Sequence, residues 1–203
     1  MTKRLVVGIS GASGIVYGLR TLEVLRELGH ETHLVMSRSA ETTLAVETNR
    51  KVADVHALAT AVYSVTDVAA ALSSGSFATD GMVVAPCSIR SLSEIATGVT
   101  SSLLTRAADV TLKERRRLVL MVRETPLHPG HLRTRAQASE LGAVIFPPVP
   151  AFYGWPESVD DIVDQTVGRV LDLFGIDNKL APRWGTPPAE GGKAVRAFPR
   201  RIP

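Results

Sequence analysis

The chain has 203 residues, of which 45% are hydrophobic and 21% are charged, and its formal net charge is +3. This composition excludes bulk disorder, and the longest apolar runs, such as 81–86 and 143–146, are too short to span a bilayer. We therefore expect a soluble cytoplasmic protein in which residues 1–185 form a single domain.

Cysteine usage and the location of the basic charge exclude further classes. Cys87 is the only cysteine, which excludes an intrachain disulfide and a cysteine-based metal cluster. The excess positive charge lies in residues 186–203, a segment rich in proline and glycine. We expect this segment to be a poorly ordered, solvated extension, and we do not expect nucleic acid as a partner.

Strand and helix patterns alternate along the chain. The apolar run Arg4–Ile9 predicts a buried strand, and apolar residues spaced by three or four between 15 and 28 predict a helix that Gly29 ends. Similar patterns predict strands at 32–37, near 62, at 82–85, 118–122 and 143–146, and helices ending near 46 and at 88–96, 102–113, 131–141 and 159–171. Because helices separate the strands, we expect an open, mostly parallel α/β sheet with helices on both faces, in three layers.

The first strand is followed by the glycine-rich turn Gly8–Gly14. In an open α/β sheet ligands bind beyond the carboxyl ends of the strands. Glycines let the backbone approach a ligand closely, and the next helix offers free N–H groups to an anion, with Ser10 and Ser13 as further donors. The turn matches neither the dinucleotide fingerprint nor a P-loop. It predicts a phosphate site; a tight turn without a ligand is the alternative.

Arg106, Asp109 and Lys113 are spaced by three and four residues, which places them on one face of a predicted helix. From spacing alone, a surface ion-pair ladder is the favoured interpretation. The turn 73–76 is rich in serine, but such turns usually only connect elements.

Arg123 and Glu124 directly follow the predicted strand 118–122, where active sites collect. An ordinary loop pair is an equally good interpretation of these two residues. His128 and His131 lie three residues apart without a third ligand nearby, so we expect no metal site.

Seven short motifs occur in a fixed order. They read GISGASG at 8–14, SSGSF at 73–77, MVVAPCS at 82–88, RAADVTLKERR at 106–116, RETPL at 123–127, PAFY at 150–153 and PRWG at 182–185. Together they resemble the UbiX family of flavin prenyltransferases over about residues 4–185. The resemblance implies a flavodoxin-like (Rossmann-like) sheet, reduced FMN as acceptor and dimethylallyl phosphate as donor. The implied product is prenylated FMN, with a new ring across flavin N5 and C6, made without a metal.

The resemblance also implies roles for individual residues. Those implied for FMN binding are Ser10, Gly11, Ala12, Ser13, Ser37, Ser88 and Arg106. Those implied for dimethylallyl phosphate are Ser74, Gly75, Lys113, Arg123, Tyr153, Arg169 and Trp184. The implied catalytic residues are Glu124, Ser13, Glu47 and Lys113. In this scheme Glu124 moves a proton, while cationic side chains stabilise the departing phosphate.

The family further implies a homo-oligomer, such as a dodecamer, and a partner decarboxylase that uses prenylated FMN on aromatic or acrylic acids. This chain departs from the family pattern at Ser101-Ser102, where Asp-Asn is usual, so a flavin or inter-subunit contact there stays open. Two alternatives remain. The first is a related FMN-dependent decarboxylase that oxidises a peptidyl cysteine, although residues 86–90 lack its asparagine. The second is a carrier that only delivers FMN.

Overall fold

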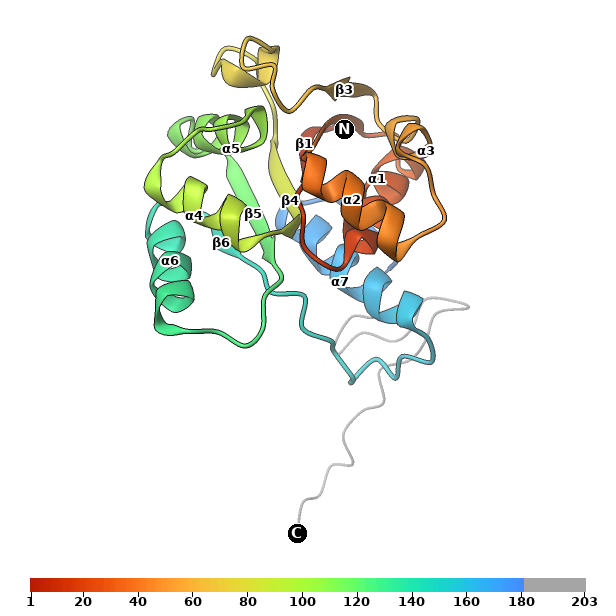
Figure 1. Ribbon diagram of the computed structural model, residues 1–203. Helices are drawn as coiled ribbons and strands as arrows, with labels where there is room; N and C mark the ends of the chain where they lie inside the picture. The colour runs from red at the N-terminus through yellow and green to blue at the C-terminus, as the bar shows by residue number, and fades with distance from the viewer. Residues whose placement is uncertain (181–203) are drawn as a thin grey trace. The chain divides into compact units, whose positions relative to one another are not determined.

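Figure 1 shows the computed structural model of the chain, which describes residues 1–180. The chain divides into two compact units, Met1–Pro148 and Val149–Pro203, and each is described here by itself. Trp184 and the predicted extension 186–203 lie outside the described residues. The single domain expected over 1–185 stays a prediction.

The first unit is built on a six-stranded sheet in which every pair of neighbouring strands is parallel. Its strands are β1 (Arg4–Ile9), β2 (Glu31–Met36), β3 (Ala61–Tyr63), β4 (Gly81–Cys87), β5 (Arg117–Val122) and β6 (Val144–Ile145). Their order is β3-β2-β1-β4-β5-β6, so the winding direction changes between β1 and β4. This confirms the predicted open parallel sheet and places the ligand crevice beyond the ends of β1 and β4.

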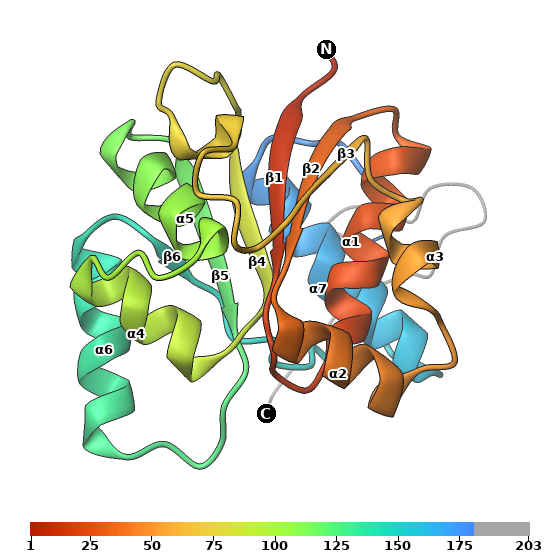
Figure 2. The same cartoon turned by 45° about the horizontal axis from the view of Figure 1, so that its top comes forward.

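Helices of the first unit cover both faces of this sheet. They are α1 (Ile15–Glu27), α2 (Arg38–Glu47), α3 (Val52–His56), the 3-10 helix η1 (Ala71–Ser73), α4 (Ile89–Thr97), α5 (Leu103–Lys113) and α6 (Pro129–Glu140). Figure 2 shows α4, α5 and α6 on one side of the sheet and α1 on the other. The predicted layered α/β architecture is therefore confirmed.

The core explains why the strands are apolar over their whole length. On one face, Val84 and Leu120 of the sheet belong to the same buried cluster as Leu92 of α4 and Leu104 of α5. Neighbouring strand residues point to the opposite face and are also fully buried, as Val83 shows. Burial on both faces is typical of parallel sheets and removes the polar-apolar alternation of half-exposed strands.

Element boundaries differ from the predictions by a few residues. The helix predicted at 131–141 begins at Pro129, because proline fits the first helical turn and the His128 side chain accepts the N–H of Gly130. The last predicted strand shortens to Val144–Ile145, which pairs with β5 alone.

The second unit contains α7 (Val159–Leu173), as the apolar pattern predicted. Its first turn is held by a capping box in which Ser158 accepts the N–H of Asp161. After the helix ends, the Asn178 side-chain amide donates to the carbonyl of Gly168 at 3.1 Å. Over the described part of the chain, no helix is long and apolar enough to cross a membrane.

The first turn of α1 is held by a carboxylate from α2. Gly14 precedes the helix with a φ of 97° and has no side chain to cap it. Glu47, the last residue of α2, accepts the N–H groups of Gly14 and Ile15, both at 2.9 Å. A helix start has unpaired N–H groups and a partial positive charge, so a carboxylate there is stabilising. The turn after β1 and the end of α2 therefore form one unit.

The pKa of Glu47 reflects these contacts. Partial burial by itself would raise the pKa. Hydrogen bonds from the Ser13 side chain and from the N–H groups of Ile15 and Gly14, together with the charge of Arg123, outweigh burial and lower it below the ordinary glutamate value.

We predict that Glu47→Gln destabilises the protein in a pH-dependent way. The folded state lowers the pKa of Glu47, so the ionised carboxylate stabilises the folded protein. This stabilisation is fully present above the ordinary glutamate pKa of about 4.3, and it is lost as the pH falls through the lower pKa of the folded state. At pH 7 the free energy of unfolding of Glu47→Gln should be lower than that of wild type by no more than about 1 kcal/mol, since Glu47 is exposed.

Urea unfolding at several pH values measures this difference. Glu41→Gln, an exposed glutamate in the first turn of the same helix, is the control. A difference between wild type and Glu47→Gln that stays constant down to about pH 3 would contradict the assignment.

Candidate functional site

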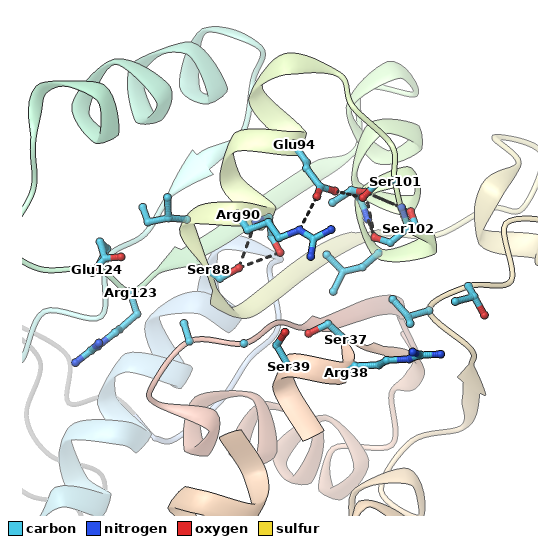
Figure 3. A pocket seen from close by; sticks show the side chains of 18 residues that line it. Ser37, Arg38, Ser39, Ser88, Arg90, Glu94, Ser101, Ser102, Arg123 and Glu124 are labelled. Atoms are coloured by element: carbon cyan, nitrogen blue, oxygen red, sulfur yellow. Dashed lines mark hydrogen bonds and ion pairs between the residues drawn. The ribbon is translucent and has the colours of Figure 1, made fainter. Parts of the chain in front are cut away.

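A cavity of about 660 Å³ lies at the carboxyl edge of the sheet (Figure 3). Its volume is within the usual range of small-molecule sites. The polar and glycine-turn residues that line it are Gly11, Ala12, Ser37, Arg38, Ser39, Thr66, Ser88, Arg90, Ser91, Glu94, Ser101, Ser102, Thr105, Arg123 and Glu124. The cavity therefore lies where the strand order predicts a ligand.

Three helices begin at this cavity, each with a serine as its N-cap. Ser37 caps α2, Ser88 caps α4 and Ser102 caps α5, and each hydroxyl accepts a backbone N–H of its own first turn. The starts of these helices carry partial positive charge and free N–H groups, which favour a bound anion. Arg38 and Arg90 add two full positive charges to the lining. The arrangement suits a phosphate group.

The turn after β1 is fixed from two sides. The buried Ser10 hydroxyl donates to the carbonyl of Pro86 at 2.9 Å and accepts the N–H of Ser88 at 2.7 Å, which joins the end of β1 to the end of β4. At Gly11, a Cβ atom would lie 2.2 Å from the Cβ of Ser39, so only glycine allows this approach of turn and helix. Ser10 thus shapes the cavity, whereas Gly11 and Ala12 line it.

Arg123 and Glu124 follow β5 and line the same cavity. The Arg123 N–H donates to the carbonyl of Cys87 at 3.2 Å, which extends the strand pairing to the site. The Glu124 carboxylate accepts the N–H of Thr125 at 3.0 Å. Figure 3 shows both residues at the end of the cavity away from Ser101 and Ser102. One end of the cavity therefore offers a carboxylate and a cation close to the turn after β1.

Arg106, Lys113, Ser74 and Gly75, all assigned by resemblance, do not line this cavity, and the Ser74 hydroxyl instead hydrogen-bonds that of Ser76 at 2.8 Å. Arg106 donates to Asp109 at 2.6 Å and to the Ser73 carbonyl at 3.2 Å. Lys113 pairs with its neighbour Glu114, and a Cβ on Gly75 would lie 2.8 Å from the Lys113 Nζ. The Arg106–Asp109 pair thus forms as spacing predicted, and Lys113 instead joins a cluster around the turn 73–76.

This cluster and the cavity occupy opposite edges of the sheet. Gly75 precedes β4 and Lys113 precedes β5, whereas Ser88 and Glu124 follow the same two strands. A strand of six residues spans roughly 20 Å. A single chain therefore does not bring Ser74, Gly75 and Lys113 to the cavity that Glu124 lines, and Arg106 is not among the lining residues either.

Two further assigned residues belong to the second unit. The Tyr153 hydroxyl accepts from the Gln165 side chain at 3.2 Å, and Arg169 pairs with Asp172 at 2.7 Å. Their roles at the donor phosphate stay predictions, as does that of Trp184.

Sequence reasoning missed several lining residues. Arg38 and Arg90 each lie in the first turn of a helix that begins at the carboxyl edge of the sheet. Arg38 directly follows its cap Ser37, and Arg90 is the second residue after its cap Ser88. Basic residues at such positions were a signal that could have been used, because helix starts usually favour acidic residues. Glu94, one turn beyond Arg90, gave no separate signal.

Cys87 and the histidines take no visible part in this site. Burial raises the pKa of the Cys87 thiol to about 12, so it is an inert core residue, as expected. His128 and His131 stack on each other with ring centroids 3.6 Å apart. Within residues 1–180, no group of three or more His, Cys, Asp or Glu could hold a metal ion.

Comparison with known proteins places the chain in a family. The family model described as Flavoprotein matches residues 1–171. The flavin prenyltransferase UbiX of Escherichia coli K12 is 60% identical over 185 residues, which cover 90% of this chain and 98% of the relative.

Two crystal structures are similar over nearly their whole length. AnUbiX (PadA1), in complex with FMN and dimethylallyl pyrophosphate, gives a TM-score of 0.90 at 50% identity and covers 92% of this chain and 99% of its own. A dodecameric FMN-dependent UbiX-like decarboxylase from Escherichia coli O157:H7 gives 0.88 at 49% identity, covering 90% of this chain and 100% of its own. The motifs, the fold and these identities agree, and the chain belongs to the UbiX family of flavin prenyltransferases.

Proposed function

We propose that this protein transfers a dimethylallyl group from dimethylallyl phosphate to N5 and C6 of reduced FMN. The observation that carries the proposal is the cavity at the carboxyl edge, which has helix starts with Arg38 and Arg90 in one part and Arg123 with Glu124 in another. The 60% identity to a flavin prenyltransferase and the similarity to a complex with FMN and a prenyl pyrophosphate support it.

The residues present fit FMN. The phosphate would bind at the starts of α2, α4 and α5, where Arg38 and Arg90 add positive charge. The flavin would then extend along Gly11 and Ala12, where the turn lacks bulky side chains, toward Glu124. The absence of a Cβ at Gly11 lets the turn pack against Ser39 and keeps this side of the cavity open.

For this reaction the protein must stabilise the leaving phosphate and move protons as the new ring forms. When the bond between the allylic carbon and the phosphate oxygen breaks, negative charge develops on phosphate, and cationic groups stabilise it. Before the ring closes, the central alkene carbon of the bound chain must take up a proton. When the tertiary carbon then bonds to C6, C6 must lose its proton, and we assign Glu124 to carry protons in this step. Ser13, which hydrogen-bonds Glu47, lies in the turn after β1 and assists that transfer. In the first bond-forming step the allylic carbon bonds to N5, N5 loses its proton and phosphate leaves with the electrons of the broken C–O bond. In the second step the alkene is consumed as its tertiary carbon bonds to C6.

Arg123 provides a cation within one chain, but Lys113 and Arg106 lie outside the cavity. We propose that a second copy of the chain supplies them, so that the complete site forms between subunits of a homo-oligomer. The dodecameric form of a relative at 49% identity supports an assembly of this kind. A cytoplasmic location and delivery of the product to a partner decarboxylase are part of the same proposal.

The first test is direct. The purified protein is incubated without oxygen with reduced FMN and either dimethylallyl phosphate or dimethylallyl pyrophosphate, and the flavin is analysed by mass spectrometry. We expect a five-carbon adduct of FMN. Binding of FMN without an adduct from either donor would favour the carrier, and oxidation of a peptidyl cysteine would favour the decarboxylase alternative.

The second test concerns Glu124. We expect Glu124→Gln to bind FMN as wild type does but to form the adduct slower by a factor of about 100 or more, because the amide cannot accept the proton. Glu140→Gln, an exposed glutamate at the end of α6 that does not line the cavity, is the control. An unchanged rate for Glu124→Gln would remove this residue from the mechanism.

The third test asks whether two chains build one site. Glu124→Gln and Lys113→Ala should each be nearly inactive alone. If they are unfolded, mixed and refolded together, random assembly should restore up to about a quarter of the wild-type rate, because some sites combine an intact Glu124 with an intact Lys113 from another chain. If both residues of one site come from the same chain, the mixture stays inactive.

A further inference from the structure

A carboxylate on α4 joins two parts of the cavity wall. The Glu94 carboxylate accepts from Arg90 Nε at 2.9 Å and from the Ser101 hydroxyl at 2.7 Å (Figure 3). The Thr105 side chain of α5 is a third hydrogen-bond partner. Glu94 thus contacts its own helix, the loop 98–102 and the first turn of the next helix.

Exposure differs strongly between the two charged partners. The Glu94 side chain is 15% exposed, whereas that of Arg90 is 81% exposed. An exposed arginine samples many rotamers, and fixing it costs conformational entropy. Ser101 and Thr105 hold the Glu94 carboxylate in place, so its hydrogen bond to Arg90 restricts the arginine side chain before a ligand binds.

The geometry of the pair leaves Arg90 available to a ligand. Glu94 binds the Nε atom, so the two terminal nitrogens of the guanidinium remain for another acceptor. In Figure 3 the guanidinium points into the cavity between α4 and the start of α2. It therefore faces the same space as Ser37 and Arg38, where helix starts favour an anion.

The same carboxylate reaches the loop 98–102, whose Ser101 and Ser102 line the cavity. Neither serine carries a negative charge. Glu94 brings a carboxylate to Ser101, while Ser102 caps α5. The loop is therefore anchored to α4 through Glu94.

We propose that Glu94 is a positioning residue for FMN: Ser101 and Thr105 hold its carboxylate in place, and the carboxylate holds Arg90 toward the flavin's phosphate. This inference rests on the proposed function, since it takes FMN as the ligand. The inference predicts the direction in which FMN affinity changes when the charge of Glu94 is removed. A carboxylate near a phosphate repels it, so electrostatics alone predicts that removing the charge strengthens FMN binding. Positioning predicts the opposite.

The experiment measures dissociation constants for FMN and for riboflavin, which lacks the phosphate, by flavin fluorescence. The variants are Glu94→Gln, Arg90→Gln and the double substitution, with Glu41→Gln as a charge-matched control that does not line the cavity. We expect Glu94→Gln and Arg90→Gln each to weaken FMN binding about three- to tenfold and riboflavin binding less than about twofold. The double variant should bind FMN no more weakly than Arg90→Gln, because Glu94 acts through Arg90.

Three outcomes would overturn the inference. The first is unchanged or tighter FMN binding in Glu94→Gln. The second is equal weakening of FMN and riboflavin together with a lower melting temperature, which indicates a purely structural role. The third is additive effects in the double variant. If Glu94→Gln does not fold, Arg90→Gln still tests the phosphate contact. Failure of the wild-type protein to bind FMN would instead refute the proposed function.

Discussion

Parallel pairing is the constraint on which the rest of this structure depends. When all neighbouring strands run the same way, every strand ends at one edge of the sheet, and the helix that follows it starts there. The free N–H groups of α2 and α4 consequently meet beside the turn after β1, and α5 starts at the same cavity. The Ser10 hydroxyl fixes this arrangement by joining the ends of β1 and β4, the two strands between which the winding direction changes.

The same constraint separates Lys113 and Glu124, the two residues to which the proposed function assigns one reaction. Lys113 ends the helix before β5, and Glu124 follows that strand, so the strand itself keeps them apart. No rearrangement of side chains bridges a strand of this length. If both residues serve one reaction, Lys113 must come from a second chain. An isolated chain would then be inactive even if it were stably folded.

The sequence predicted the features that depend on periodicity and turn chemistry. The apolar runs predicted the strands, and the glycine-rich turn marked the site because it follows the first strand, whereas Ser88 was assigned by resemblance alone. The position of Arg90 at a helix start was a signal in the sequence, but its link to Glu94 was not, because a cation and a carboxylate four residues apart on a helix are usually a solvated ion pair. Only the three-dimensional position of α4 shows that this pair faces a cavity. Spacing predicted the Arg106–Asp109 pair, but it could not show that Lys113 and Arg106 lie outside the cavity, since this depends on which edge of the sheet each residue lies at.

Acidic residues lie in and beside the cavity whose helix starts favour an anion, and two of them show how their charge is offset. Glu47 accepts N–H groups at the start of α1 and feels the charge of Arg123, and Glu94 is bound by Arg90 and Ser101. Burial alone would raise the pKa of each carboxyl group, but hydrogen bonds and nearby cations outweigh it and lower both. Each carboxylate therefore stays ionised at neutral pH while a cation offsets its charge. Glu94 fixes the orientation of Arg90 by a direct hydrogen bond, so the negative charge on the cavity wall is paired before a ligand binds.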